Sequence, residues 1–190
     1  MNDSKTLVDR VLKGDPNAFT QIVAQNERLV GQIVFRLIPN ATDREDLCQE
    51  VFFKVYRNLE GFQFNSKLST WIARIAYNTC LSYLDKKKLP LLDDCCPQNE
   101  ANEPEMLDGI RPDEWTESRQ TSVRVCQEID KLPVIYGTIV SLYHLHDMSY
   151  AEIGRILSLP DGTVKSYLFR ARRLLKERLL EKYSREELCA

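Results

Sequence analysis

The fold is decided by a stretch near the C-terminus, which reads SYAEIGRIL at residues 149–157, SLPDG at 158–162 and TVKSYLFRARRLLK at 163–176. Apolar residues recur three and four apart on both sides of the central segment, which is typical of helices. Pro160 and Gly162 mark a tight break between them. A short helix, a break and a longer helix have the spacing of a helix-turn-helix, whose second helix enters the DNA major groove.

Both predicted helices carry start signals. Ser149 and Glu152 have the spacing of a capping box, in which each side chain binds the other residue's backbone N–H. Asp161 is expected to cap the second helix. An apolar stripe at helical spacing then predicts the side that packs inward. Its members are Val164, Leu168, Ala171 and Leu175.

The opposite face of the second helix is polar and basic, and residues 161–182 hold seven basic and three acidic side chains. Arg and Lys suit guanine edges or phosphates, Ser suits either, and Phe suits a thymine methyl group. The same charges would also suit a merely solvated face, but their coincidence with the helix-turn-helix favours DNA. The candidate DNA contacts are Thr163, Lys165, Ser166, Phe169, Arg170 and Arg173.

Composition places the chain among soluble globular proteins of one or two domains, because 43 % of its 190 residues are hydrophobic and 28 % are charged. No apolar run is long enough to span a membrane, and the polar start MNDSKTLVDR lacks a signal-peptide core, so we expect a cytoplasmic protein. The six cysteines form no C-x-x-C pair and no zinc-ligand spacing. We therefore expect reduced thiols, no metal site and no cofactor.

Helical periodicity and proline content divide the chain. We predict an all-α fold of two small helical domains, residues 1–88 and 121–184, joined by an acidic flexible linker at 89–120 and followed by a tail at 185–190. The linker is rich in proline and acids and too poor in apolar residues to close a core. Adjacent Cys95 and Cys96 lie in it, and a redox role for them is an open alternative.

The net charge of −2 hides an uneven distribution. Residues 1–88 have 13 basic and 10 acidic side chains, residues 89–130 have 3 and 11, and residues 131–190 have 10 and 7. Two basic parts of net charge +3 therefore flank an acidic part of −8. Weakly basic modules should bind DNA poorly alone and well only when a partner presents both together.

Three motifs carry a resemblance to a known family: GTVKSYLFRAR at 162–172, DREDLCQEVF at 43–52 and LSTWIARIAYNT at 68–79. They resemble, in the same order, parts of the bacterial sigma factors of the extracytoplasmic-function (ECF) group. The resemblance implies an initiation subunit of RNA polymerase, with a sigma-two domain that binds core polymerase and the minus-ten element. It also implies a sigma-four domain that binds the minus-thirty-five element. Tyr167 and Gly154 depart from the family, where a basic residue and alanine are frequent.

The resemblance assigns two further groups of site residues. The outer face of the helix around 43–59 would bind the clamp of the largest polymerase subunit. Without the family match, the same residues would be interpreted as an ordinary solvated helix face. Its candidates are Asp46, Gln49, Glu50 and Phe53. The loop at 60–67 and the helix after it, capped by Ser69 or Thr70, would hold an unstacked base and the phosphates of the minus-ten strand. Their candidates are Lys67, Ser69, Thr70, Arg74, Asn78, Lys86 and Lys87. Trp71 is expected in the core.

The implied partners are core RNA polymerase, through its clamp and flap, promoter DNA, and a cognate anti-sigma factor that is often membrane-anchored. No phosphate loop, H-E-x-x-H or G-x-S-x-G motif is present, so we expect no enzyme activity. His144 and His146 lack metal-ligand partners nearby in sequence. Two alternatives stay open: a polymerase-independent helix-turn-helix regulator that dimerises through its N-terminal bundle, and a protein-interaction adaptor.

Overall fold

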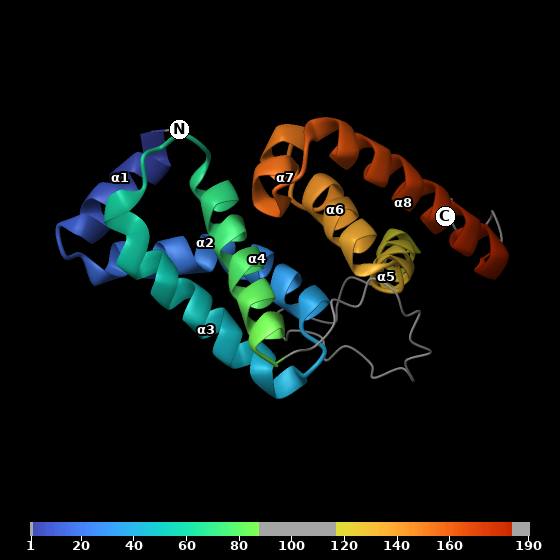
Figure 1. Ribbon diagram of the computed structural model, residues 1–190, viewed down its shortest axis with the longest axis horizontal. Coiled ribbons are helices and arrows are strands. Elements are labelled where there is room, and N and C mark those ends of the chain that lie inside the picture. Colours follow the sequence, from blue (N-terminus) through green and yellow to red (C-terminus); the bar gives the residue numbers. More distant parts are fainter. Residues whose placement is uncertain (1, 88–116, 184–190) are drawn as a thin grey trace.

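The computed structural model describes residues 2–87 and 117–183. Every regular element in these ranges is a helix, as the sequence predicts, and the helices form two units (Figure 1). None of these helices is both long and apolar enough to cross a membrane. The tail, Cys95, Cys96 and most of the predicted linker lie outside the described residues.

The N-terminal unit contains four helices and one short 3-10 turn. They are α1 (Asn2–Leu12), α2 (Pro16–Leu37), α3 (Ala41–Asn58), the turn η1 (Leu59–Gly61) and α4 (Leu68–Lys87). Local signals set the helix starts. The Asp15 carboxylate accepts a hydrogen bond from the backbone N–H of Asn17 at 2.9 Å, and Pro16 occupies the first position of α2. The side chain of Asn40 caps α3 in the same way, on the N–H of Thr42.

The core of this unit lies where α2 packs against α1, α3 and α4. The predicted inward stripe of α3 is confirmed, because each of its members is buried: Leu47, Val51, Val55 and Leu59. Helix α4 begins at Leu68, so the expected cap at Ser69 or Thr70 is wrong; both residues lie within its first turn. Trp71 is half-buried against the core, 5.1 Å from the ring of Phe62.

The C-terminal unit also has four helices. They are α5 (Glu117–Asp130), α6 (Val134–His144), α7 (Tyr150–Leu157) and α8 (Asp161–Lys182). Helix α5 starts before the boundary predicted at residue 121, so the last residues of the expected linker are helical. The stripe predicted for α8 packs inward, with Val164, Leu168 and Ala171 buried and Leu175 half-buried.

Helices α7 and α8 form the predicted helix-turn-helix. The capping box of Ser149 and Glu152 is present at the start of α7. The predicted cap at Asp161 is wrong, because Asp161 is the first residue of α8 and Pro160, before it, makes no side-chain cap bond. Gly154 has a structural reason: a Cβ there would lie 2.6 Å from the carbonyl oxygen of Leu159 in the turn. Only glycine allows this close approach.

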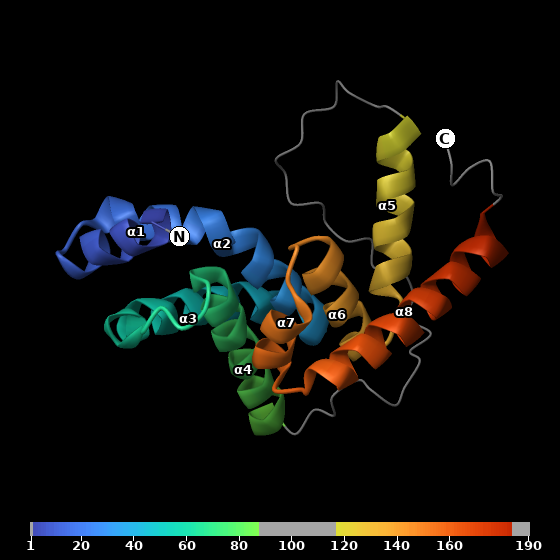
Figure 2. The ribbon, with the colours of Figure 1, turned by 90° about the horizontal axis from the view of Figure 1, so that it is seen from above.

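The two units pack against each other. Helix α7 lies along α4, and α6 contacts α2 near its C-terminal end (Figures 1 and 2). The C-terminal unit therefore covers the side of the N-terminal unit that α4 and the end of α2 form. Helix α3 lies on the opposite side of α4 from α7 and contacts no helix of the C-terminal unit extensively.

Candidate nucleic-acid interface

The predicted reading face of α8 is exposed. Phe169 has 70 % of its surface exposed, and Thr163 is half-buried at the helix start. The other members of the face are all exposed: Lys165, Ser166, Arg170 and Arg173. Because Val164, Leu168 and Ala171 anchor the helix from beneath, the face is held rigidly toward solvent. The structure thus brings all six predicted residues onto one helix and leaves them accessible.

Not every basic residue of α8 belongs to this face. The Arg172 guanidinium donates to Nε2 of His144 at 3.1 Å and lies over the ring of Tyr143. Burial and the charge of Arg172 lower the pKa of His144, which keeps the imidazole neutral as an acceptor. Arg178 donates to the carbonyl of Lys131 at 2.6 Å. These two arginines fasten α8 to α6 and to the end of α5.

The buried carboxylate of Glu128 holds the far end of α8. Lys182 and Lys131 lie 2.8 Å and 2.9 Å from its Oε1. Burial by itself would raise the pKa of Glu128, but hydrogen bonds from the two ammonium groups lower it overall. The basic excess that the sequence shows in α8 is therefore divided between a reading face and internal contacts.

The predicted minus-ten residues do not form one cluster. Lys67 lies just before α4, and Thr70, Arg74 and Asn78 follow at helical spacing along the helix. Lys87, at the other end, lies about 30 Å from Lys67 by helical rise. Arg74 and Asn78 are exposed, and Ser69 is half-buried.

The lysines at the other end of α4 differ from each other. Lys87 is paired with Asp43 at 3.0 Å and lies over the ring of Tyr83, whose hydroxyl also binds Asp43. Hydrogen bonds from Tyr83 and Lys87 lower the pKa of the Asp43 carboxyl. Lys86 is exposed. Of these two lysines, Lys87 ties α4 to α3 and Lys86 stays accessible to solvent.

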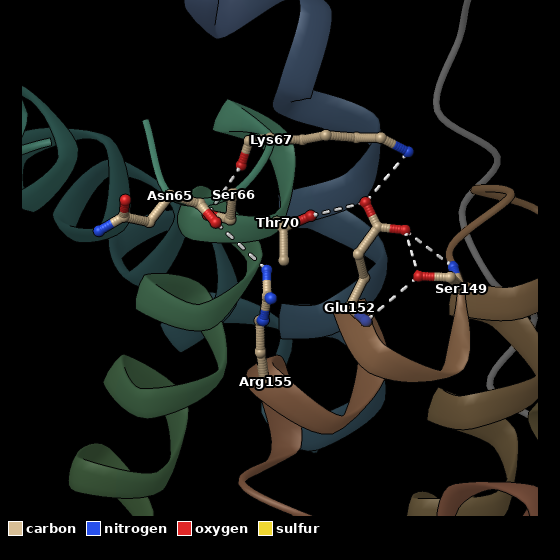
Figure 3. Close-up of polar contacts among 7 residues, drawn as sticks. All are labelled: Asn65, Ser66, Lys67, Thr70, Ser149, Glu152 and Arg155. Atoms are coloured by element: carbon tan, nitrogen blue, oxygen red, sulfur yellow. Dashed lines mark hydrogen bonds and ion pairs between the residues drawn. The ribbon is translucent and has the colours of Figure 1, made fainter. Parts of the chain in front are cut away.

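The start of α4 is covered by α7 (Figure 3). Oε1 of Glu152 lies 3.0 Å from the Lys67 ammonium and accepts a hydrogen bond from the Thr70 hydroxyl at 3.3 Å. Oε2 of the same carboxylate accepts from the backbone N–H and the hydroxyl of Ser149 at 2.9 Å and 2.7 Å. Thr70 is only 2 % exposed.

The charge of Glu152 is strongly stabilised. Burial by itself would raise the pKa of its carboxyl, but the hydrogen bonds from Ser149 and the ammonium of Lys67 bring that pKa to about 2. Beside it, Nη1 of Arg155 donates to the backbone carbonyl of Asn65 at 3.3 Å (Figure 3). Sequence reasoning missed both contacts, because they join residues more than 80 positions apart.

The predicted polymerase-binding residues form an exposed stripe on α3. Asp46, Gln49 and Glu50 are exposed, and Phe53 has 59 % of its surface exposed. Glu50 pairs with Lys54 at 2.7 Å. The guanidinium of Arg57 lies over the Phe53 ring, 5.6 Å from its centroid. An exposed aromatic side chain among polar neighbours is compatible with a protein-binding surface.

Sequence reasoning missed one neighbour of this stripe. Tyr56 is 55 % exposed, packs its ring edge-on against Phe19 at 5.0 Å, and lines a hollow of about 370 Å³ between the start of α2 and α3. It lies three positions from Phe53 and so borders the same helix face. That spacing is the signal that would have found it.

The described residues show no metal-binding arrangement. Within 2–87 and 117–183, no three His, Cys, Asp or Glu side chains come together as metal ligands. His146 instead lies 2.6 Å, by its Nε2, from Oε1 of Gln32 in the other unit. Burial and then the charge of Arg28 lower the pKa of His146.

Both units match families of bacterial transcription proteins. Residues 22–89 match the model for sigma-70 region 2, and residues 124–175 match the model for sigma-70 region 4. The fold and these matches define a sigma factor with one region in each unit. The chain is 35 % identical over 183 residues to the ECF RNA polymerase sigma factor SigW of Bacillus subtilis, covering 92 % of this chain and 96 % of the relative. It is 33 % identical over 179 residues to the ECF RNA polymerase sigma-E factor of Escherichia coli K12, covering 92 % and 93 %. The chain belongs to the ECF RNA polymerase sigma factors.

Solved structures share the fold at low sequence identity. CnrH in complex with the cytosolic domain of CnrY aligns with a TM-score of 0.63 at 21 % identity, covering 95 % of this chain and 99 % of CnrH. The sigma factor RpoE of Bartonella quintana, in complex with the anti-sigma factor NepR, aligns with a TM-score of 0.63 at 20 % identity, covering 87 % and 98 %. Both alignments extend across the two units.

Proposed function

We propose that this chain directs core RNA polymerase to specific promoters and assists their opening, with region 2 in the N-terminal unit and region 4 in the C-terminal unit. The observation that carries the proposal is the pair of exposed faces, one on α3 and one on α8, within a chain of this family. A polymerase-independent regulator would need only the second. Such a regulator needs no protein-binding face on α3, so the exposed Phe53 among its polar neighbours favours the polymerase subunit.

Region 4 would read the minus-thirty-five element with the first turns of α8. Lys165 and Arg170 present exposed charged donors, and Phe169, four positions after Lys165, presents an apolar edge. Guanidinium and ammonium groups suit guanine O6 and N7, and an apolar ring suits a thymine methyl group. Thr163 and Ser166, nearer the helix start, suit phosphates. The face thus combines base and backbone contacts, as a recognition helix requires.

Region 2 would hold the opened minus-ten strand along α4. Lys67, just before the helix, and Arg74 and Asn78, on successive turns of it, supply charged or polar groups that suit a strand running along the helix. Phe64, 41 % exposed in the loop before α4, adds an aromatic surface for stacking. Binding an unstacked base compensates for the few kcal/mol of stacking that opening costs. Promoter opening then needs no nucleotide hydrolysis by this chain, and the polymerase performs all the chemistry.

The α3 surface, defined as Asp46, Gln49, Glu50 and Phe53, would bind the clamp of the largest polymerase subunit. A partly exposed Phe inside a polar rim has the composition of an interface anchor. Region 4 would reach the flap. The chain between Lys87 and Glu117 can span at most about 100 Å, which lets the two regions bind separate sites on one polymerase.

Regulation by an anti-sigma factor is part of the proposal. Solved structures with this fold, CnrH and RpoE, are in complex with CnrY and with the anti-sigma factor NepR. A partner that covers the α3 surface and the α8 face would block polymerase and DNA together. The site of action would be the bacterial cytoplasm, where the polymerase transcribes.

Run-off transcription tests the proposal. Purified core polymerase is incubated with this protein and a library of promoter fragments from the same genome, and the RNA products are sequenced. We expect RNA with defined 5′ ends that depends on the added protein. Absence of such RNA, together with failure of the protein to co-purify with core, would overturn the proposal.

A further inference from the structure

Lys165 contacts the first helix of the helix-turn-helix. Its ammonium lies over the ring of Tyr150, 5.5 Å from the ring centroid. Tyr150 is the first residue of α7, and Lys165 lies near the start of α8. A cation within about 6 Å of a ring centroid is attracted by the negative face of the ring. The contact therefore joins a residue of the predicted reading face to a residue of the neighbouring helix.

A second tyrosine holds the ring of Tyr150 in place. Tyr150 stacks on Tyr143, with the ring centroids 5.3 Å apart and the planes at 15° to each other. Tyr143 lies in the last turn of α6, and both tyrosines are half-buried against the core. A tyrosine side chain has only two torsions, so packing leaves it little freedom. Tyr143 and Tyr150, the tyrosine pair, thus form a rigid support beside α8.

The tyrosine pair meets two cations of α8, and these are bound differently. Lys165 and Arg172 are seven positions apart, so they lie on the same side of α8, two turns from each other. Arg172 lies over the ring of Tyr143 and also donates to His144 at 3.1 Å. Lys165 is exposed and meets the ring of Tyr150, which leaves its N–H donors available to DNA. Arg172 therefore serves the fold, whereas Lys165 can serve recognition.

A lysine needs such a support in order to read a base. Its ammonium is a point charge on a flexible stem, and ordering that stem costs up to about 2 kcal/mol. Phosphates accept the charge at many places along the groove and so add affinity without sequence information. A base edge accepts it at one place only. Restricting the stem before DNA arrives lowers the cost of reaching that place.

The arginines of the reading face depend less on a neighbouring helix. The guanidinium of Arg173 pairs with Glu177, one turn further along α8, at 3.0 Å. A guanidinium is also a planar fork whose donors are fixed relative to one another. Lys165 has no such fork, and the ring that restricts it belongs to α7.

We propose that Tyr150 is a positioning residue for promoter recognition, and that the tyrosine pair holds the Lys165 ammonium toward one base pair of the minus-thirty-five element. The inference rests on the function proposed above and adds a residue that sets its specificity. Tyr150 acts through Lys165 and needs no contact of its own with DNA. Loss of the attraction between ring and ammonium should therefore weaken discrimination between bases more than it weakens binding to DNA in general.

Two replacements of Tyr150 separate this role from packing. Tyr150→Phe keeps the negative ring face and removes the hydroxyl. Tyr150→pentafluorophenylalanine has nearly the shape of the Phe variant, but its fluorine atoms withdraw electron density from the ring face and remove the attraction for a cation. Because the two rings pack alike, both variants are expected to fold.

The same two replacements at Tyr136 are the matched control. Tyr136 is also a half-buried tyrosine of region 4, and its ring packs edge-on against Tyr167 at 5.7 Å. Tyr167 is two positions from Lys165 and so lies on another side of α8. Changes at Tyr136 should therefore alter an aromatic contact of α8 without affecting Lys165.

Lys165→Met identifies the base pair that Lys165 reads. Methionine has no charge and an unbranched side chain of similar length. The base pair is the one at which this variant no longer discriminates. Combining Lys165→Met with each Tyr150 variant completes a double-mutant cycle, which shows whether Tyr150 acts through Lys165.

Competition binding measures the effects with holoenzyme made from core polymerase and the full chain. The competitors are promoter fragments in which each minus-thirty-five base pair is changed in turn, together with DNA of unrelated sequence. We expect about tenfold discrimination at the Lys165 base pair for the wild type, Tyr150→Phe and both Tyr136 variants. Tyr150→pentafluorophenylalanine should reduce it about two- to fivefold and leave binding to unrelated DNA nearly unchanged. In the Lys165→Met background, the two Tyr150 variants should behave alike.

Three results would overturn the inference. The two Tyr150 variants could discriminate alike with Lys165 present, which would exclude a role for the ring face. Their difference could persist in the Lys165→Met background, which would exclude action through Lys165. Lys165→Met could also keep full discrimination at every base pair, so that Lys165 reads no base. Failure of the proposed function looks different, since the wild-type holoenzyme would then prefer no promoter fragment over unrelated DNA.

Discussion

The α3 surface and the start of α4 belong to the same small unit, yet one is open and the other is covered. Phe53 on α3 is 59 % exposed, whereas Thr70 on α4 is 2 % exposed beneath Glu152. The covering residue comes from region 4, so the start of α4 lies at the contact between the regions, whereas α3 makes no extensive contact with region 4. In this arrangement a protein partner can reach the α3 surface more easily than a ligand can reach the start of α4.

The largest effect should come from the open surface. Phe53→Ala removes a central aromatic anchor and should weaken core binding by about 2–4 kcal/mol. Phe35→Ala is the matched control, because Phe35 is also an exposed phenylalanine of the same unit with an arginine over its ring, but it lies on α2 outside the α3 surface. Titration of fluorescent protein with core polymerase measures both. Equal affinities of the two variants for core polymerase would show that the α3 surface does not bind it.

The contact of Glu152 with the start of α4 should make the stability of the protein depend on pH. The pKa of Glu152 is lowered from 4.5 to about 2, so its stabilising effect is complete above pH 4.5 and is lost as the pH falls toward 2. Up to about 3 kcal/mol of the free energy of unfolding depends on this charge, part of it inside region 4 through Ser149. Urea unfolding at pH 6 and pH 3 measures the loss.

Glu152→Gln should flatten that pH dependence, since the amide does not titrate. Asp147→Asn is the control, because this neighbouring acid makes no contact with α4. A pH dependence that is unchanged by Glu152→Gln would show that other carboxyl groups carry it.

Variants of two arginines in α8 should affect promoter binding and stability separately. Arg170→Ala should cost about 1–3 kcal/mol in promoter binding by the holoenzyme, measured by mobility shift, and leave the melting temperature unchanged. Arg172→Ala should do the opposite, because Arg172 binds His144 and lies over the ring of Tyr143 within region 4. If both variants lost promoter binding alike, the division of α8 into reading and internal residues would be wrong.

The smallest effect concerns His146 in the contact between the regions. Burial and the charge of Arg28 lower its pKa, so the neutral ring favours the contact between the regions above pH 6.5, and this preference is lost as the pH falls below 6.5. The groups that face it are Gln32 and Arg28 on α2, Arg36, which lines a small cavity with it, and Asp147 beside it. Scattering should therefore show slight expansion between pH 8 and pH 5.5.

His146→Gln should remove this expansion, because the amide keeps a donor for Gln32 without titrating. His144→Gln serves as the control, since His144 contacts Arg172 within region 4. Expansion that persists in His146→Gln would assign the pH effect to another group.

Sequence alone predicts what local signals determine. The all-helical fold, the capping box at Ser149, and the inward stripes of α3 and α8 are confirmed because each depends on spacing within one helix. The prediction that Asp161 caps α8 is wrong, because the helix begins at Asp161 itself, one residue earlier than the local sequence suggests. Departure from the family at Gly154 is explained only by the carbonyl of Leu159, which folding brings close.

The contacts between the regions could not be predicted in this way. Lys67 reads as a phosphate-binding residue in the sequence, and nothing nearby shows that Glu152 will pair with it. Lys87 likewise reads as a DNA contact, but folding places it on Asp43. Charged side chains choose their partners in space, and periodicity carries no information about that choice. The sequence therefore predicts which residues are candidates for the site. Which of them are paired with other parts of the chain is decided by the tertiary structure.

Site-specific photocrosslinking tests the central claim most directly. A benzophenone side chain replaces Phe53 in one protein and Arg74 in another, and each is irradiated with core polymerase, with promoter DNA, and with both. The account predicts that position 53 crosslinks to the largest polymerase subunit with or without DNA, and that position 74 crosslinks to the minus-ten strand only when core is present. Crosslinking of position 74 to DNA without core, or no crosslink of position 53 to polymerase, would contradict it.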